Sequence, residues 1–439
     1  MRSIFSCLVL AGLALAVVTP AGAAPLLLIS LDGLRAADSA NAETMPALAA
    51  LRREGDWAEH VFGVWPTLTY PSHTTLVTGV PPTQHGIGGN EAFDPLAINR
   101  EGWMWFARDI RADTLWAAAR RAGLKSAAIN WPVTVGAPID DNLPQIWDTK
   151  GPEDAGLTRA LSTPGLVAKL EHETGVTYPL GSDGSCEADE RRARFAEALI
   201  ADDAPILTAV HLECLDHLQH DFGPDSAEAR TARTKLDAMV AKLVASARAH
   251  LPHLAVAIVS DHGFAPVHTA INLDAAFRSA GLLGSNARGR PVSWSAAPWS
   301  LSGTAGIILM NPGDRAVRTK VEALLGKLQA NPATGIDKVL TGADAATTQG
   351  DQRIAYWIVF KTGFSAGGYR SGPLIQMSEL KGTHGYPPHR AEMAASFIVS
   401  NPERPRQGNL GDIPMTSIAG RLAAIIGAKL ADANAESAK

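Results

Sequence analysis

The sequence predicts an α/β protein whose central, largely parallel sheet lies between helical layers, with an inserted or capping subdomain. Continuous apolar runs at 25–31, 204–212 and 254–260 have the length of strands buried on both faces. Amphipathic helical segments alternate with them, as in parallel sheets. The alternation is lost from about 275 to 375. The expected divisions are a signal segment (1–24), the first part of a catalytic core (25–275), the inserted or capping subdomain (276–375), the return of the core (376–430) and a tail (431–439).

The first 24 residues have the layout of a cleavable secretory signal. Arg2 precedes an apolar run, and small residues follow Pro20. We expect an exported protein, periplasmic or secreted, without a membrane anchor in its mature form, because no later run reaches about 18 apolar residues. Removing this segment leaves 38 basic and 44 acidic side chains. This mildly acidic balance, without a block of Lys or Arg, argues against specific nucleic-acid binding and sets no oligomeric state.

The core elements follow from local patterns. Three strands end in acids: Asp32 follows the first, Asp216 lies just beyond the second, and Asp261 follows the third. In open α/β sheets, ligands collect beyond the carboxyl ends of the strands, so we expect these acids to converge on one site. Further helices are expected at 44–54, 113–122, 226–250 and 413–428, and further strands at 57–64, 125–130 and 394–399.

A hydroxyl-rich stretch, 65–79, contains the candidate nucleophile. Pro71 suits the first turn of a helix, so Thr69 and Tyr70 fall at the helix N-terminus. Free backbone N–H groups and the helix dipole favour a phosphate or sulfate there. A hydroxyl in this place could attack such a group. A glycine-rich loop follows at 85–90, and we expect its backbone to approach a ligand closely.

Carboxylates and imidazoles occur in the mixture that suits zinc. Asp216 and His220 are four residues apart, which places them on one helical turn, and Asp261 and His262 adjoin at a strand exit. With Asp32 and His384 they supply about the number of ligands that two zinc ions need. The remaining candidates are given structural roles: His73, His85, His211, His217, His268 and His389. Pairing of Cys186 with Cys214 stays open, because sequence does not give their distance.

The motifs in chain order are Asp32-Gly33, Pro66-Thr-x-Thr69-Tyr-Pro71, Thr78-Gly79, His85-Gly-Ile-x-Gly-Asn90, Asn130-Trp-Pro132, Asp216-x-x-x-His220 with Gly223-Pro224, Asp261-His-Gly263 and His384-Gly-Tyr386. In this order, they resemble the nucleotide pyrophosphatase/phosphodiesterase family of the alkaline phosphatase superfamily. The resemblance covers most of the mature chain and implies the alkaline-phosphatase-like fold.

The resemblance also implies residue roles. Thr69 would be the nucleophile, and Asn90 would donate its amide to a phosphoryl oxygen. One of two zinc ions would be bound by Asp216, His220 and His384, and the other by Asp32, Asp261 and His262, with Thr69 completing it. The chain departs from the family pattern at Leu68, Ser72 and Gln219.

The implied function is zinc-dependent hydrolysis of phosphodiester or nucleotide pyrophosphate bonds through a phosphothreonine. A monoesterase needs extra cations, and 128–132 carries none, so we expect a small diester or nucleotide substrate. Tyr70 and Trp131 are candidate contacts for its organic group. A phosphonate or phosphomonoester hydrolase of the same superfamily is the alternative, and a non-catalytic periplasmic zinc-binding protein is a weaker one. The sulfatase signature is absent around Thr69.

Overall fold

The computed structural model describes residues 23–98, 103–147, 153–179, 183–286, 288–367 and 372–431. The expected signal segment, apart from Ala23 and Ala24, and the expected tail, apart from Ala431, lie outside these residues. Among the described residues, no helix combines the length and apolar character needed to cross a bilayer.

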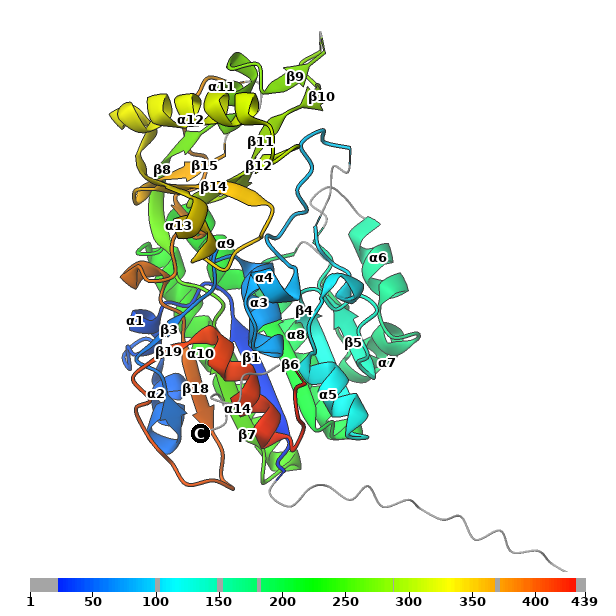
Figure 1. The fold of residues 1–439 in the computed structure, drawn as a ribbon. Coiled ribbons are helices and arrows are strands. Elements are labelled where there is room, and N and C mark those ends of the chain that lie inside the picture. Colours follow the sequence, from blue (N-terminus) through cyan, green and yellow to red (C-terminus); the bar gives the residue numbers. More distant parts are fainter. Residues whose placement is uncertain are drawn as a thin grey trace, which may run out of the picture.

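A seven-stranded sheet forms the centre of the core (Figure 1). Its strands, in spatial order, are β2 (Asp56–Trp57), β18 (Phe397–Ser400), β7 (Ala255–Val259), β1 (Leu26–Leu31), β6 (Leu207–Leu212), β4 (Ser126–Trp131) and β5 (Asp141–Pro144). The five strands from β7 to β5 are parallel, and β18 is antiparallel to β7. Every residue of β1, β6 and β7 is buried. The prediction of a largely parallel sheet from continuous apolar runs is therefore confirmed.

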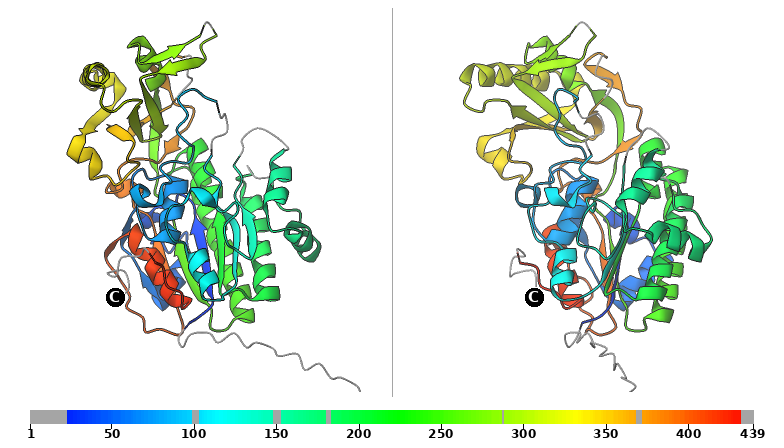
Figure 2. Two further views of the ribbon diagram at one scale, coloured as in Figure 1. Left: turned by 45° about the vertical axis from the view of Figure 1, so that its right-hand side comes forward. Right: turned by 90° about the vertical axis from the view of Figure 1, so that its right-hand side faces the viewer.

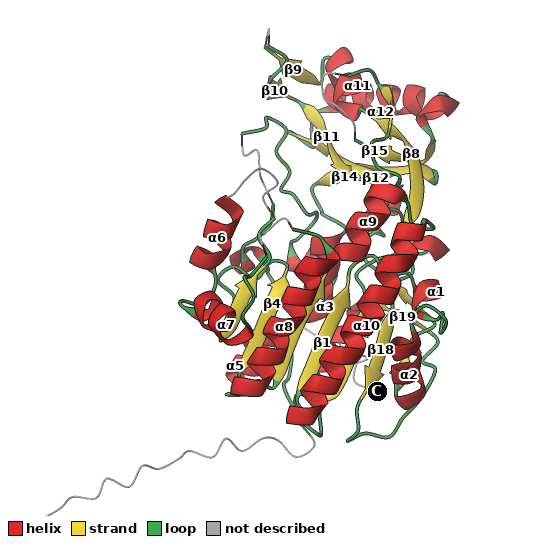
Figure 3. Ribbon diagram, turned by 180° about the vertical axis from the view of Figure 1, so that it is seen from behind, coloured by secondary structure: helices red, strands yellow, loops and turns green. Residues whose placement is uncertain are grey.

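Helices cover both faces of this sheet (Figures 1 and 3). One face packs against α2 (Pro46–Glu54), α7 (Leu166–Thr174), α8 (Cys186–Asp203), α9 (Cys214–Phe222) and α10 (Ala227–His250). The other packs against α3 (Thr69–Thr78), α5 (Leu115–Arg121) and α14 (Ile418–Ile425). Side-chain caps begin several helices, because Ser226 accepts a hydrogen bond from the Ala229 N–H and Thr114 accepts one from the Ala117 N–H. Shorter peripheral elements are α1 (Ala36–Ser39), β3 (His60–Phe62), α4 (Pro82–His85), α6 (Glu153–Leu161) and β19 (Asp412–Pro414).

A second unit, here called the cap, stands over the carboxyl ends of the parallel strands (Figure 2). Its antiparallel sheet contains β11 (Ala296–Leu301), β12 (Thr304–Leu309), β14 (Ile354–Phe360) and β13 (Ile336–Thr341), and a smaller sheet contains β15 (Gly363–Ala366), β8 (Ala265–Ile271), β16 (Ile375–Met377) and β17 (Gly382–Thr383). The rest is α11 (Leu273–Ser279), β9 (Leu283–Ser285), β10 (Pro291–Trp294), α12 (Arg315–Ala330) and α13 (Gly342–Ala346). The cap is wider than the expected 276–375, because β8 pairs with β15, β16 and β17.

The glycine-rich loop at 85–90 contacts the cap. A Cβ on Gly89 would lie 2.8 Å from the Trp299 ring, and one on Gly88 would lie 2.8 Å from the Asp351 carboxylate. These glycines therefore admit side chains of the cap. At Gly88 and Gly89 the groups that approach closely are Asp351 and Trp299, and the expected approach of this loop to a ligand stays a prediction.

Cys186 and Cys214 form a disulfide. Each is the first residue of its helix, so the bond joins α8 to α9. Asp189 of α8 adds to this junction, since its carboxylate accepts hydrogen bonds from the backbone N–H groups of Glu213 and Cys214 at 3.0 and 2.8 Å. The start of α9 is thus held in place, and α9 carries Asp216 and His220.

Candidate active site

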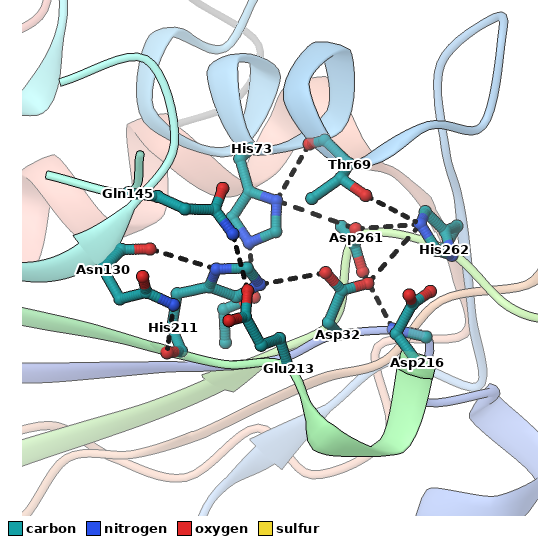
Figure 4. Close-up of polar contacts among 12 residues, drawn as sticks. Asp32, Thr69, His73, Asn130, Gln145, His211, Glu213, Asp216, Asp261 and His262 are labelled. Carbon is teal, nitrogen blue, oxygen red and sulfur yellow. Dashed lines mark hydrogen bonds and ion pairs between the residues drawn. The ribbon is translucent and has the colours of Figure 1, made fainter. Parts of the chain in front are cut away.

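Thr69 is the first residue of α3, and Leu68 before it is extended, so the helix begins at the expected place. The Thr69 side chain lies beside His262, with 3.4 Å between Oγ1 and Nε2 (Figure 4). The Tyr70 N–H donates to Asn90 Oδ1 at 2.9 Å. An N–H can only donate, so this contact fixes the orientation of the Asn90 amide and leaves its NH₂ group for a ligand.

An inner pocket is formed by Asp32, Asp261 and His262, with Thr69 at its edge. The acids follow β1 and β7, neighbouring strands of the sheet. Nε2 of His262 is 3.0 Å from Asp261 Oδ2 and 3.5 Å from Asp32 Oδ1. Both of these carboxylate oxygens are buried and have no hydrogen-bond partner in the described part of the chain. Orphaned buried acceptors of this kind fit a cation.

An outer pocket is formed by Asp216, His220 and His384. Asp216 Oδ1 lies 3.4 Å from His220 Nε2, and Oδ2 lies 3.8 Å from His384 Nε2. The rings of His262 and His384 stack with centroids 3.7 Å apart, so the pockets adjoin. Ligand atoms of Asp216, His262 and His384 lie within 4.8 Å of one another, as do those of the inner pocket. His220 stands outside that closest group, although the family resemblance assigns it to the outer ion.

The three imidazoles share one tautomer, with the proton on Nδ1. Nδ1 of His220 donates to Gly382 O at 2.9 Å, Nδ1 of His384 donates to Thr67 O at 2.9 Å, and Nδ1 of His262 donates to Gly263 O at 3.1 Å. A carbonyl oxygen only accepts, so each Nδ1 carries the proton and each Nε2 presents a lone pair to the site. This arrangement is usual for histidines that bind metals.

The electrostatics also fit a cation. Burial, followed by the neighbouring Asp261 and Asp216 carboxylates, raises the pKa of Asp32 well above its usual range. Burial, with His262 and His220 nearby, holds the pKa of His384 well below the ordinary value. Burial lowers the pKa of His262, but the Asp261 carboxylate outweighs burial and raises this pKa overall. Negative groups that repel one another in a dry pocket are stabilised by a cation between them.

A cavity of about 170 Å³ opens beside Thr69 and the outer pocket. Its aromatic wall is continuous, because Tyr70 packs against Trp103 at 5.2 Å between ring centroids and Trp103 packs against Trp147 at 5.8 Å. No Lys or Arg is among its described lining residues, which are Asp32, Thr69, Tyr70, Asn90, Trp103, Gln145, Trp147, Glu213, Asp216, His217, His220 and His384. Trp103 and Trp147 were missed in the sequence, where no local pattern marks them, since Trp147 precedes Asp216 by 69 residues.

Trp131 does not line this cavity. It is fully buried and packs edge-on against Trp116 and His73, at 5.9 and 5.0 Å between ring centroids. The prediction that Trp131 contacts the substrate is wrong, because its side chain lies in the hydrophobic cluster that joins β4 to α3 and α5.

The departures from the family pattern have structural explanations at two positions. Leu68 packs with Trp65 against Trp299 and Leu301 of the cap. Gln219 of α9 donates from Nε2 to Gly33 O at 3.0 Å, which ties the outer pocket's helix to the loop that carries Asp32. Ser72 is buried, and nothing in the structure explains the change there.

A model of the type I phosphodiesterase / nucleotide pyrophosphatase family matches residues 26–387. The chain belongs to this family. The match includes every predicted metal ligand, from Asp32 to His384, and confirms the family that the motifs indicated.

Curated relatives agree. Ectonucleotide pyrophosphatase/phosphodiesterase family member 1 of Homo sapiens is 27% identical over 255 residues, which are 54% of this chain and 23% of that protein. A bis(5'-adenosyl)-triphosphatase of Pongo abelii is 28% identical over 255 residues, which are 57% of this chain and 50% of the relative. The matched part therefore spans about a quarter to a half of these relatives.

Among solved structures, an inactivated murine ectonucleotide pyrophosphatase / phosphodiesterase 5 in complex with AMP superposes with a TM-score of 0.66. Its identity to this chain is 21%, and the match covers 94% of this chain and 97% of that one. The likeness shows a shared fold and confirms the predicted alkaline-phosphatase-like architecture.

Proposed function

We propose that the chain hydrolyses phosphodiester or nucleotide pyrophosphate bonds with two zinc ions and a phosphothreonine intermediate on Thr69. The observation that carries the proposal is the place of the Thr69 hydroxyl, at the N-terminus of α3 and 3.4 Å from His262 Nε2 of the inner pocket. Asp32, Asp261 and His262 would hold one ion, and Asp216, His220 and His384 the other. When bound, zinc ions favour deprotonation of a nearby hydroxyl and offset charge on phosphoryl oxygens.

The chain's own groups orient and stabilise the reaction. Thr69 Oγ1 gives up its proton to solvent and attacks phosphorus, and the leaving oxygen departs with the bonding electrons and takes a proton from water. Thr69 then carries the phosphoryl group with its remaining ester until water displaces it from Oγ1. The Asn90 NH₂ group donates to an equatorial oxygen, where negative charge develops. The positive end of the α3 dipole favours the same charge. The Asn90 amide is held in place by the Tyr70 N–H before the substrate arrives.

The cavity favours a diester over a monoester. Its described lining contains no cationic side chain that would meet the extra charge of a monoester. Trp103 and Trp147, which are half-buried, instead offer flat surfaces for an organic group such as a nucleoside, and the fully buried Tyr70 packs behind Trp103. Two relatives support a nucleoside as the organic group, since one is named a bis(5'-adenosyl)-triphosphatase and the inactivated murine protein is in complex with AMP. A phosphonate or phosphomonoester hydrolase with the same pockets is the second candidate.

Export to the periplasm or the medium is part of the proposal. The signal-like segment at 1–24 supports it. The Cys186–Cys214 disulfide supports it independently, because such bonds persist in oxidising compartments.

The test compares second-order rate constants for a nitrophenyl phosphate monoester, its methyl and nucleotidyl diesters and a nitrophenyl phosphonate, on one zinc-loaded sample. We expect the diesters to be preferred, activity to vanish with a chelator, and zinc to restore it. A monoester advantage of about tenfold, roughly 1.4 kcal/mol of transition-state stabilisation, contradicts the diesterase assignment alone. Full turnover in metal-free protein contradicts the metal mechanism.

A further inference from the structure

His211 lies at the centre of the sheet, beneath the inner pocket. It belongs to β6, pairs with Ser30 of β1 in register, and is fully buried. Both ring nitrogens are engaged. Nδ1 donates to Asn130 O of β4 at 3.1 Å, and Nε2 lies 3.0 Å from Asp32 Oδ2, where one proton carried by either group completes the hydrogen bond (Figure 4). The ring thus connects β4, through β6, to the acid that follows β1.

The two carboxylate oxygens of Asp32 have different surroundings. Oδ2 is bound to His211, whereas Oδ1 is buried, has no hydrogen-bond partner among the described residues, and lies 3.5 Å from His262 Nε2. A carboxylate at the end of a strand can rotate about two side-chain bonds and can offer either oxygen. The hydrogen bond from one side removes this freedom. Oδ1 is the oxygen left facing the pocket.

We infer that His211 is a positioning residue for the inner zinc ion, which holds Asp32 so that Oδ1 alone is presented as a ligand. The inference rests on the proposed function, because it concerns the ion proposed for the inner pocket. Hydrogen bonds to metal ligands typically alter metal affinity by about 10- to 100-fold when they are removed. An effect of this size is expected at the inner pocket. The outer pocket has other supports, in Gly382 O and Thr67 O.

The competing explanation is that His211 only fills space. Its ring lies 4.3 Å from the His73 ring, and His73 has its own hydrogen bonds to Ser30 Oγ and Thr69 O. A packing role predicts that any change of shape at His211 matters equally. A positioning role predicts that zinc binding depends only on the nitrogen that faces Asp32. Variants that keep a nitrogen near Nε2 or near Nδ1, one at a time, therefore distinguish the positioning role from the packing role.

The experiment measures zinc content and the two zinc dissociation constants of the full chain by competition with a chromophoric chelator. Three variants are compared with wild type. H211F removes both hydrogen bonds, H211Q places an amide nitrogen near the position of Nε2, and H211N places one near the position of Nδ1. H85F is the matched control, because His85 is equally buried and bonds to Thr75 Oγ1 rather than to a proposed ligand.

We expect H211F and H211N to weaken one of the two zinc sites by about 10- to 100-fold, and H211Q to stay close to wild type. H85F should lower the unfolding temperature and leave both dissociation constants unchanged. Wild-type zinc binding by H211F, or equal losses in H211N and H211Q, overturns the positioning role while the proposed function stands. If H211F does not fold, the contrast between H211N and H211Q decides. A wild-type chain that binds no zinc overturns the proposed function and this inference together.

Discussion

The inner and outer pockets are built on different parts of the molecule. Asp32, Asp261 and His262 follow neighbouring sheet strands, and their side chains are at most 5% exposed. In the outer pocket, Asp216 and His220 lie on α9, with side chains 12% and 21% exposed, and His384 follows β17 of the cap. Gly382 permits this junction, because a Cβ there would lie 2.4 Å from Gln219 O.

The difference separates two ways of holding ligands. Ladder hydrogen bonds between β1 and β7 set the inner acids relative to each other. The outer ligands depend on a helix held at its start by Asp189 and the disulfide, and on a cap loop that meets it. The sheet therefore sets the geometry of the inner pocket, whereas contacts between the core helix α9 and the cap set the geometry of the outer pocket.

The largest expected effect comes from Thr69, the proposed nucleophile at the edge of the inner pocket. Thr69→Ala should lower turnover by at least ~10³-fold while zinc content stays at the wild-type value, because the pocket acids remain. Stopped assays and metal analysis on the same sample measure both quantities. Thr74→Ala is the control on the same helix, since the Thr74 hydroxyl donates to Tyr70 O of that helix. Wild-type turnover in Thr69→Ala would show that another group attacks phosphorus.

Removing the disulfide should weaken the outer pocket selectively. Replacing Cys186 and Cys214 together by Ala opens a loop of sequence separation 28 and should lower the free energy of unfolding by about 3.5 kcal/mol. Urea denaturation with a chelator present measures this loss. At temperatures where the variant stays folded, zinc should bind more weakly to one site only. Equal weakening of both sites would contradict the division into two separately held pockets.

Trp299 tests how the cap acts on the core through Gly88 and Gly89, which precede Asn90. Trp299→Ala removes the ring against which these glycines pack, so the Asn90 loop should shift. We expect kcat to fall roughly tenfold, about 1.4 kcal/mol, with little change in KM. In an Asn90→Ala background the same substitution should have no further effect on kcat. Additive losses in the double variant would mean that Trp299 acts by another route.

Acidification should release the inner ion first. Burial lowers the pKa of His262, but Asp261 outweighs burial and raises it. Burial raises the pKa of Asp32. Both side chains therefore hold their protons to a higher pH than usual. Burial lowers the pKa of His384, which stays neutral well below the ordinary value of about 6.5. Protons therefore compete with zinc at the inner pocket from a higher pH, by up to about tenfold in affinity per pH unit and group. Zinc content followed from pH 8 to pH 5 checks this order.

The sequence alone determined the features that depend on local pattern. Continuous apolar runs marked β1, β6 and β7, and the acids at their ends marked Asp32, Asp216 and Asp261, because parallel strands bring their carboxyl ends to one edge. Pro71 marked the start of α3 with Thr69 at its first turn. The order of these motifs also indicated the family. The roles of Thr69, Asn90 and the metal ligands stay predictions until the zinc and turnover measurements are made.

The tertiary structure decided what depends on which distant segments meet. Trp131 and His211 both belong to strands buried on both faces, and sequence does not tell which buried side chain reaches a site. Packing places Trp131 against Trp116 in the core and His211 against Asp32. The cap residues that meet Gly88 and Gly89 lie more than two hundred residues away in the chain, and the segment that completes the outer pocket meets His220 across a separation of 162 residues. Local periodicity carries information about one element at a time, whereas these contacts follow from how the finished sheet, helices and cap fill space together.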